Sequence, residues 1–448
     1  MFVDQVTGLS FLYSRDIARN KDIDEESLAY FLCFGYLPGN KTLFKDVTYE
    51  PHGASKACTA ESICSYLKST LHYDEETLLK LGVSAWEGAV AGTLMSNPGA
   101  IVVPISGGLD SRAVLGELLK HFSAKSIATY TFGTPGTWDY EIGNSVAKQA
   151  GTNHVSYDLQ EYSFTQERLE NRALLSNGAT DLFTLAPLDY IARDFSTEGT
   201  VIWSGFMGDP SVGSHIPDPD LLAKWEDNYC LNKERYAKNV ELEKYLASGS
   251  NLELFVSLPK VPDNSVLFAE ELWDFQNRQM RYVIPQVLPE GHSYALPFLD
   301  KSWLQFALNL PLNWRKGQKF YKQMLCEAYP GLFSLPVKNN MGLPLGAPSW
   351  IVAMSRTLNV ASSPVSKLFR GKTLNKNINY IDFESAIRDR PDVKSVVENN
   401  IIDLKKRGLI KKDFIEKLWR QHQCKSENCS RALTLLASLE LLLKVTND

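Results

Sequence analysis

The chain has 448 residues, of which 44 % are apolar and 22 % are charged, and its formal net charge is −5. This length and composition are typical of two or three soluble domains with a large core, and the acidic balance argues against a nucleic-acid-binding protein. The sequence contains no run of the roughly 18 apolar residues that span a membrane, no signal-peptide pattern at its start and no C-x-x-C pair among seven scattered cysteines, so we expect a cytoplasmic protein with reduced thiols.

Residues 1–72 alternate short apolar stretches with Gly, Pro and Asn, which predicts a small N-terminal segment. A helix is predicted over residues 74–94, because its apolar residues recur at helical spacing and Asp74 is suited to cap its start. We therefore expect the main domain, residues 73–448, to begin at this helix.

The following stretch alternates β-rich apolar runs with helical segments. Strands are predicted at residues 100–106, 126–132, 153–159 and 200–205, and helices at 112–122 and 140–151. Continuous apolar strands between helices indicate βαβ units, an α/β fold class and a parallel sheet covered on both faces. Ligands of such sheets bind at the carboxyl ends of the strands, where ISGG, TFGT and WSGF occur here.

From about residue 220 the pattern is mostly helical, and it ends in a long apolar helix at residues 430–445. Residues 335–348 are rich in Pro and Gly and predict a loop without regular structure. Residues 362–376 predict a second, exposed loop. The expected architecture is thus a parallel-sheet core followed by a mostly helical C-terminal part.

The turn after the first predicted strand is SGGLDS, at residues 106–111. Glycines at such a turn let backbone N–H groups face a ligand, and the helix N-terminus that follows attracts anions such as phosphate. Asp110 is compatible with a phosphate only if a cation such as Mg²⁺ lies between them; the alternative is that it caps the helix. The GKT at residues 371–373 lacks the glycine that a Walker loop requires and predicts only an exposed loop.

Other segments carry recognisable patterns in a consistent order. They are FGYLPGNKTLFKDVTYEPHG (34–53), TFGTPGTWDYEIGNSVAKQAGTNH (131–154), WSGFMGDPSVG (203–213), LPFLDKSWLQFALNLP (296–311) and LPVKNNMGLPLG (335–346). Together with SGGLDS, they resemble the asparagine synthetase family of ATP pyrophosphatases, which includes β-lactam synthetases and lasso-peptide cyclases. The resemblance covers roughly residues 28–445 and implies a PP-loop core of the adenine nucleotide alpha hydrolase type.

The resemblance implies an enzyme that adenylates a substrate carboxylate, releases pyrophosphate and passes the acyl group to an amine. It implies that Asp110 and Asp209 hold Mg²⁺, and that Lys338, with Asp110, is catalytic because it stabilises developing negative charge. The simpler alternatives are that Asp209 caps the following turn and that Lys338 is a solvated loop lysine. The ATP-binding residues implied by the family pattern are Ser106, Gly107, Gly108, Asp110, Ser111, Thr131, Phe132, Gly133, Gly205 and Phe206.

The chain departs from the family at its N-terminal segment. Family glutaminases carry a cysteine directly after the initiator Met, whereas residue 2 is Phe and the nearest cysteine is Cys33. We therefore expect residues 1–72 to be a truncated, inactive glutaminase-like segment. The amine would then come from free ammonia, a partner protein or the substrate itself.

The chain also departs from the family around the site. Phe206 stands where β-lactam synthetases have a catalytic Tyr, and Ser293 stands where asparagine synthetases have a Glu. Glu290 and His292 lie nearby in the sequence as candidate bases. Arg112 stands where a second Ser is common, and either contacts phosphate or lies at the surface.

The sequence therefore predicts an AMP-forming amide ligase that depends on ATP and Mg²⁺ and acts on a peptide side chain, a sugar acid or a small metabolite. The expected partners are a carboxylate substrate, an amine donor and an ammonia-supplying or precursor-processing protein. Two alternatives stay open. One is a non-catalytic nucleotide-binding homologue that serves a partner protein; the other is a tRNA-modifying ATP pyrophosphatase, which SGGLDS alone would also fit.

Overall fold

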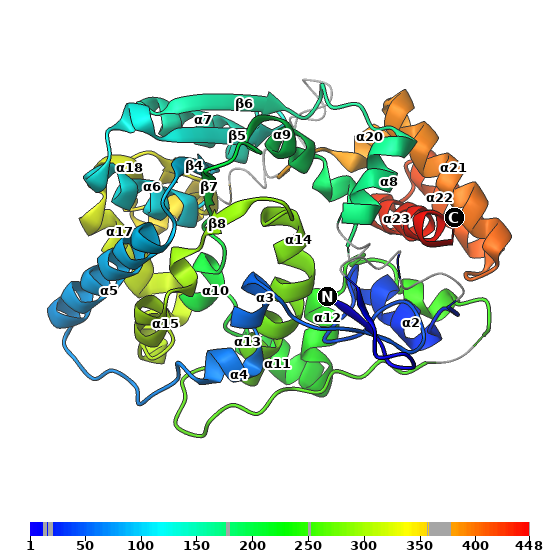
Figure 1. The fold of residues 1–448 in the computed structure, drawn as a ribbon, viewed down its shortest axis with the longest axis horizontal. Coiled ribbons are helices and arrows are strands. Elements are labelled where there is room, and N and C mark those ends of the chain that lie inside the picture. The colour runs from blue at the N-terminus through cyan, green and yellow to red at the C-terminus, as the bar shows by residue number, and fades with distance from the viewer. Residues whose placement is uncertain are drawn as a thin grey trace.

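The computed structural model describes residues 1–11, 16, 21–175, 180–249, 252–355, 357 and 378–447. The predicted loop at residues 362–376 and the GKT at 371–373 lie outside these residues. A five-stranded parallel sheet forms the centre of the main domain (Figure 1). Its strands, in spatial order, are β6 (Asn153–Asp158), β5 (Ala128–Gly133), β4 (Ala100–Pro104), β7 (Thr200–Trp203) and β8 (Ser293–Ala295).

Both faces of this sheet are covered, as the continuous apolar strands predict. Ile101 and Val103 of β4 point into one core, and Val102 between them points into a second core on the opposite face. The α/β class and the four predicted strands are therefore confirmed. The fifth strand, β8, is three residues long and follows a helix, so it leaves no periodic signal in the sequence.

The described α-helices of this region run from just before β4 to just after β7. They are α5 (Glu75–Ser96), α6 (Asp110–His121), α7 (Trp138–Ala150), α8 (Gln166–Leu175), α9 (Pro187–Asp194) and α10 (Gly208–Ser211). Among them, α6 and α7 contact the sheet. Asp74 caps α5 as predicted, because its carboxylate accepts a hydrogen bond from the Thr77 N–H at 2.8 Å. Helix α6 begins at Asp110, two residues before its predicted start.

The chain is mostly helical after the sheet, as expected. Its α-helices are α11 (Pro219–Trp225), α12 (Tyr229–Glu234), α13 (Ala269–Asp274), α14 (Ile284–Val287), α15 (Lys301–Ala307), α16 (Leu312–Arg315), α17 (Lys319–Ala328), α18 (Pro330–Phe333), α20 (Phe383–Asp389), α21 (Pro391–Arg407), α22 (Lys412–Gln423) and α23 (Ser430–Asn447). A π-helix, Phe275–Val283, joins α13 to α14. Short 3₁₀ helices occur at Ala124–Ser126, Leu182–Leu185, Glu226–Asn228, Leu242–Tyr245, Pro297–Leu299, Lys316–Gln318 and Lys338–Asn340. None of the described helices is long and apolar enough to cross a membrane.

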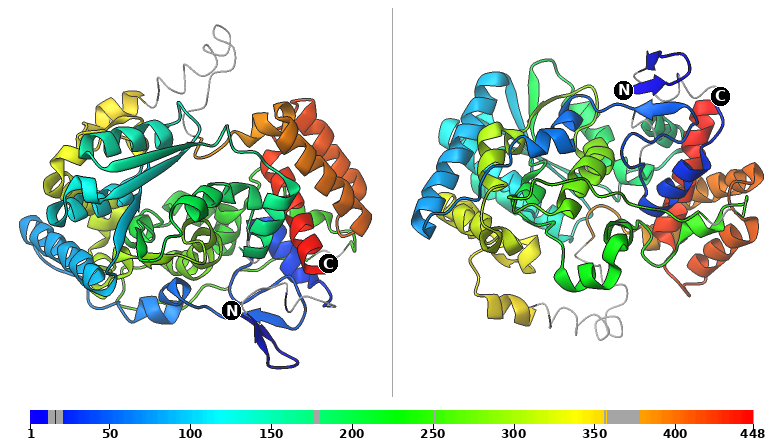
Figure 2. Two further views of the ribbon diagram at one scale, coloured as in Figure 1. Left: turned by 45° about the horizontal axis from the view of Figure 1, so that its top comes forward. Right: turned by 90° about the horizontal axis from the view of Figure 1, so that it is seen from below.

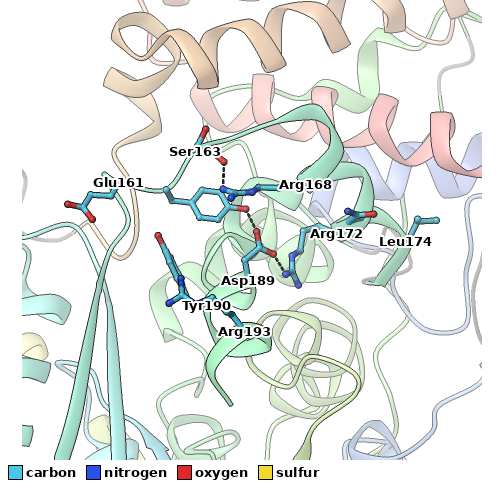
Figure 3. A pocket seen from close by; sticks show the side chains of 10 residues that line it. Glu161, Ser163, Arg168, Arg172, Leu174, Asp189, Tyr190 and Arg193 are labelled. Carbon is cyan, nitrogen blue, oxygen red and sulfur yellow. Dashed lines mark hydrogen bonds and ion pairs between the residues drawn. The ribbon is translucent and has the colours of Figure 1, made fainter. Parts of the chain in front are cut away.

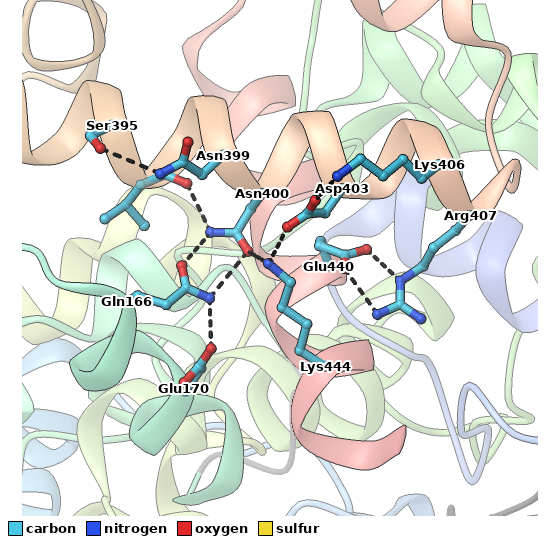
Figure 4. A network of polar contacts seen from close by, with 11 residues as sticks. Gln166, Glu170, Ser395, Asn399, Asn400, Asp403, Lys406, Arg407, Glu440 and Lys444 are labelled. Atoms are coloured by element: carbon cyan, nitrogen blue, oxygen red, sulfur yellow. Dashed lines mark hydrogen bonds and ion pairs between the residues drawn. The ribbon is translucent and has the colours of Figure 1, made fainter. Parts of the chain in front are cut away.

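The C-terminal helices form a bundle at the end of the molecule opposite α5 and α6 (Figures 1 and 2). Polar contacts hold two of its helices together and join them to α8 (Figure 4). The Lys444 ammonium of α23 donates to Asn400 at 3.0 Å and pairs with Asp403 of α21 at 2.7 Å. Asn400 donates in turn to Gln166 of α8 at 2.8 Å, which connects the bundle to the sheet domain.

The N-terminal segment forms a small antiparallel sheet with helices. Its elements are β1 (Phe2–Asp4), β2 (Ser10–Phe11), β3 (Val47–Tyr49), α2 (Glu25–Phe34), α3 (Ala54–Ala57) and α4 (Ala60–Cys64). The buried guanidinium of Arg281 in the π-helix donates to the carbonyls of Gly39, at 3.3 Å, and Lys41, at 3.0 Å. These contacts fix the segment against the main body of the chain.

Residues 335–348 differ from their prediction. Strands β9 (Pro336–Val337) and β10 (Leu343–Pro344) pair antiparallel around the 3₁₀ turn, so the expectation of no regular structure is wrong here. The hairpin closes through Gly342, whose φ of +78° favours glycine. A Cβ at Gly342 would lie 2.5 Å from the Trp138 ring, so the backbone itself packs against that side chain.

Candidate functional site

The candidate site lies at the carboxyl ends of β4 and β7, which are neighbours in the sheet. The chain leaves β4 toward β5 on one side, whereas β7 and β8 lie on the other side. Such a reversal of strand order opens a crevice between the two loops that follow the strands, and ligands of parallel sheets bind in it. The loops here are SGGLDS and WSGFMGD, the two that the sequence singles out.

In the SGGLDS turn, two backbone N–H groups donate to side chains, and one hydroxyl at the crevice has no partner in the described part of the chain. The Gly108 N–H donates to the Ser106 hydroxyl at 3.2 Å, and the Gly107 N–H donates to Asp139 at 3.1 Å. The hydroxyl of Ser111, in the first turn of α6, is buried and has no hydrogen-bond partner among the described residues. A buried unpaired hydroxyl at a helix N-terminus suits a phosphate oxygen.

Asp110 is held in place rather than used as a helix cap. One carboxylate oxygen accepts from the Asp209 N–H at 3.0 Å, and the other accepts from the Tyr321 hydroxyl at 2.9 Å. The helix cap is Leu109, which excludes the capping alternative. Burial, and then the nearby Asp209 carboxylate, raise the pKa of Asp110 well above its usual range, so the site favours a cation between these two acids.

The loop after β7 fits closely around Asp110. A Cβ at Gly208 would lie 2.2 Å from the Asp110 carboxyl carbon, and a Cβ at Gly205 would lie 2.8 Å from its Cβ. Met207 between them has φ +67°, a backbone conformation that costs about 1–3 kcal/mol in a non-glycine residue. Asp209 makes no capping bond and accepts from Gln318 at 2.8 Å. The loop therefore holds both acids at a fixed spacing.

These residues fit a magnesium ion that is shared with a nucleotide. The described residues contain no group of three or more His, Cys, Asp or Glu side chains that could hold a metal alone. Mg²⁺ in nucleotide sites is commonly bound by one or two carboxylates, with phosphate and water oxygens completing its shell. Asp110 and Asp209 supply two carboxylates beside the SGGLDS turn.

A cavity of about 440 Å³, here called the ATP cavity, lies over these loops, and its size suits a nucleotide. The predicted ATP and metal residues that line it are Ser106, Gly108, Asp110, Ser111, Phe132, Gly205, Phe206 and Asp209. Gly107, Thr131, Gly133 and Lys338 do not line it. The buried Thr131 hydroxyl donates to the Ile105 carbonyl at 2.7 Å, so this side chain supports the SGGLDS turn from below.

Lys338 reaches the edge of the site from the β9–β10 hairpin. Its ammonium contacts the Asp139 carboxylate and the Asn379 side chain. Its backbone N–H donates to the Gly107 carbonyl at 3.0 Å, which places the hairpin directly against the SGGLDS turn. The side chain is therefore paired at the site rather than a solvated loop lysine.

Residues 85–257 match the family model described as asparagine synthase. This stretch is an asparagine synthase domain. Domains of this family belong to ATP-dependent ligases that form amides, and they bind ATP, typically with Mg²⁺. The matched range contains both acids, whereas β8, Tyr321 and Lys338 follow it along the chain. No curated protein matches the chain.

Arg112 differs from both sequence expectations, because it neither faces the ATP cavity nor lies at the surface. Its fully buried guanidinium donates to the carbonyls of Gly107 at 3.4 Å, Leu332 at 3.3 Å and Pro336 at 2.5 Å. Burial lowers its pKa to about 10, which leaves it charged at neutral pH. Arg112 thus joins the asparagine synthase domain to the hairpin that carries Lys338.

One histidine of the ATP cavity, and the buried acid that pairs with it, gave no signal in the sequence. His215 lies just after the Asp209 loop and lines the ATP cavity. Its Nδ1 is hydrogen-bonded to the buried Asp274 carboxylate at 2.7 Å. Burial opposes the charged imidazole, but Asp274 outweighs this effect and raises the pKa of His215. The same pairing lowers the pKa of Asp274 to about 2 against the effect of burial. The carboxylate orients the imidazole, and such a pair is suited to move a proton.

Aromatic and amide groups that the sequence does not single out also reach the site. Tyr380 stacks on Phe132 with ring centroids 5.4 Å apart and lines the ATP cavity. Tyr321 and Gln318 belong to α17 and the turn before it, where their local pattern is that of ordinary helical residues. Local sequence patterns could not identify these residues, because their role depends on which distant segments of the chain lie together in the fold.

Glu290 and His292 lie away from the ATP cavity. They line a separate cavity of about 270 Å³ beside the N-terminal segment, where Glu290 lies 3.7 Å from His52. The expectation that they supply a base at the adenylation site is therefore not supported by their placement. Ser293 begins β8 and lies beside neither acid in the sheet register.

A further cavity of about 750 Å³ lies between α8 and α9 (Figure 3). None of the predicted ATP residues lines it. Two of its arginines have partners within the cavity wall: Arg172 contacts the Asp189 carboxylate, and Arg168 donates to the Ser163 carbonyl at 2.8 Å. The predicted ATP residues therefore gather at the sheet edge and not in this larger cavity.

Proposed function

We propose that the chain is an AMP-forming amide ligase that adenylates a substrate carboxylate with ATP and transfers the acyl group to an amine. One observation carries this proposal. Two acids, Asp110 and Asp209, are held together at the crevice of an asparagine synthase domain, beside a turn built for phosphate. This arrangement suits cleavage of ATP between its α and β phosphates.

In the proposed reaction, the SGGLDS turn binds the β and γ phosphates through its backbone N–H groups and the hydroxyls of Ser106 and Ser111. Asp110 and Asp209 would hold Mg²⁺, which neutralises phosphate charge when bound. A carboxylate oxygen of the substrate attacks the α-phosphorus, the bond to the bridging oxygen breaks, and pyrophosphate leaves. The amine then attacks the acyl carbon of this mixed anhydride, the acyl C–O bond breaks, AMP leaves with its electron pair, and water takes the proton that the amine loses.

Lys338 supplies a positive charge at the edge of the site where this reaction takes place. Its contacts with Asp139 and Asn379 hold the ammonium close to the turn, and exchange of Asp139 for a phosphate oxygen requires only a side-chain movement. A positioned cation that meets charge as it develops contributes about 10²–10³-fold in rate. Arg112 serves this role indirectly by holding the hairpin to the turn.

We further propose that this chain does not hydrolyse glutamine. Cys33 and Cys58 of the N-terminal segment are fully buried, and burial raises the pKa of each thiol to about 12. A thiol must ionise and reach its substrate to act as a nucleophile, and these two do neither. The amine would then be ammonia or an amine of the substrate, supplied freely or by a partner protein.

The experiment is a product analysis. The protein is incubated with ATP, Mg²⁺, ammonium chloride and a panel of acids: free aspartate, glucuronate and acidic peptides. Acid-dependent AMP and pyrophosphate, measured by chromatography, are expected, and Asp110→Asn should abolish them while the exposed control Asp220→Asn should not. Formation of ADP and phosphate would refute the proposal, and ATP binding without AMP from any acid would favour a non-catalytic homologue.

A further inference from the structure

A second cavity of about 800 Å³, here called the acceptor cavity, adjoins the ATP cavity. The residues that line both are Arg278, Val283, Gln286, Val287, Asn379 and Tyr380. Four of these six belong to the π-helix or to α14, which continues it, so this helix forms a common wall. A molecule with one end in the ATP cavity can therefore extend into the acceptor cavity.

The acceptor cavity is built from parts of the chain that lie outside the asparagine synthase domain as well as within it. Phe34 and Tyr36 come from the N-terminal segment, and Phe383 and Arg431 come from the C-terminal bundle. Its volume lies in the upper part of the range of about 300–1,000 Å³ for small-molecule sites. This space adds to the space available for ATP, which favours a substrate larger than a single metabolite.

The carboxylates of the acceptor cavity already have partners. Glu234 pairs with Arg278 at 3.1 Å, and Glu384 pairs with Arg388 at 3.2 Å. Asp382 caps α20 by accepting from the backbone N–H of Ser385 at 3.2 Å. These three acids therefore offer little attraction to an incoming cation.

Three cations of the acceptor cavity, unlike these carboxylates, have no oppositely charged partner among the described residues. Lys233, Lys238 and Arg431 form no ion pair with any carboxylate of the described residues, and donate only to backbone carbonyls. Burial lowers the pKa of Lys238, and the neighbouring Arg431 and Arg235 lower it further against the effect of Glu234. The cavity thus carries an excess of positive charge, which attracts anionic groups.

Aromatic rings form the rest of the surface. Tyr282 lies between Tyr36 and Tyr236, with ring centroids 5.7 and 6.2 Å away. Rings in this arrangement offer apolar surface to the side chains of a substrate. The three cations can each pair with a carboxylate of that substrate. A substrate with a single carboxylate, which the reaction itself consumes, would leave all three cations unmatched.

We propose that the acceptor cavity binds an acidic peptide, and that one carboxylate of this peptide extends past the common wall to be adenylated in the ATP cavity. This inference rests on the proposed function for the fate of that carboxylate, but not for the binding of the peptide. It narrows the substrate from acids in general to peptides with several Asp or Glu residues.

The test measures binding without ATP. The probe is a fluorescein-labelled octapeptide of alternating Glu and Tyr, and the comparison peptide has Gln in place of Glu. We expect the acidic peptide to bind the wild-type protein at least tenfold more tightly by fluorescence anisotropy. The double variant Lys233→Gln/Lys238→Gln should weaken this binding at least fivefold, whereas the control Lys125→Gln/Lys301→Gln, which removes two exposed lysines elsewhere, should not.

Equal binding of the two peptides, or equal binding by both double variants, would overturn the inference. So would a single-stranded oligonucleotide that displaces the acidic peptide at equal concentration, because the cavity would then bind polyanions of another class. The two proposals can fail separately. Peptide binding that depends on Lys233 and Lys238 without AMP formation would refute only the proposed function, and AMP formation unaffected by the variant would refute only the peptide site.

Discussion

Replacement of Gly208 by Ala tests whether the Asp110 carboxylate must occupy its observed position. The new Cβ would lie 2.2 Å from the carboxyl carbon, whereas ordinary contact begins near 3.4 Å, so the carboxylate must move by about 1.2 Å. Such a movement breaks at least one of its hydrogen bonds, to the Asp209 N–H at 3.0 Å or the Tyr321 hydroxyl at 2.9 Å. A hydrogen bond to a charged group contributes about 1.5–3 kcal/mol, so the Mg²⁺-dependent part of ATP affinity should fall about 10- to 150-fold.

Calorimetry with a non-hydrolysable ATP analogue measures this effect without any knowledge of the acid. Titrations in Mg²⁺ and in EDTA separate the metal-dependent part of the affinity from the rest. Gly331→Ala is the matched control, because a Cβ at Gly331 meets nothing within 4 Å. If Gly208→Ala retains the full Mg²⁺-dependent affinity in a folded protein, the assignment of Asp110 as a metal-binding residue is refuted.

Three other changes have distinct expected outcomes. Arg112→Met should lower stability by about 2–4 kcal/mol, seen as a lower melting temperature, because it leaves buried carbonyls such as that of Gly107 unpaired. Lys338→Met should reduce AMP formation at least 100-fold while ATP affinity changes less than threefold, because its charge acts on the reaction rather than on binding. The pairing of His215 with Asp274 should stabilise the protein most between pH 3.8 and 6.5. The contribution of Asp274 is lost as pH falls toward its lowered pKa of about 2, and that of His215 is lost as pH rises through its raised pKa. Urea unfolding of the wild type and of Asp274→Asn across this pH range measures the difference.

Each of these expectations can fail in a definite way. An unchanged melting temperature for Arg112→Met would mean that water satisfies the carbonyls. A Lys338→Met protein that forms AMP at the wild-type rate would exclude Lys338 from the reaction, and Lys338→Arg should keep most of the wild-type rate if only charge matters. A stability difference for Asp274→Asn that does not vary with pH would mean that the His215 pair does not form in solution.

The sequence predicts those parts of the fold that depend on local patterns of apolar residues and turn residues. Four strands of the sheet, the cap at Asp74 and the position of SGGLDS at a strand end follow from apolar runs and turn chemistry. The meeting of Asp110 with Asp209 follows because parallel strands bring their carboxyl ends to one edge. These two residues lie 99 positions apart, and topology rather than proximity in the chain predicts their contact.

Contacts that depend on tertiary packing were not predictable. Tyr321, Gln318 and Asp274 look like ordinary helical residues, and only the packed structure shows that they face the site. Only the packed structure shows that the Arg112 guanidinium is buried, because an arginine in the first turn of a helix is normally exposed. Thr131 shows the opposite error, since a residue in a matching motif supports the turn instead of lining the cavity.

The π-helix determines which side chains of its segment face the ATP cavity and the acceptor cavity. Arg278 and Tyr282 of the π-helix and Gln286 of α14 recur every four residues, and all three line the acceptor cavity. The wider turns of the π-helix offset the drift of about 40° per step that a spacing of four has in a regular α-helix. Loss of a single residue from Phe275–Val283 would tighten the turns to α-helical spacing and move the side chains of this segment relative to the cavities. The number of residues in this segment, and not only their identity, therefore sets the shape of the wall that the two cavities share. We expect a one-residue deletion here to change which substrates fit.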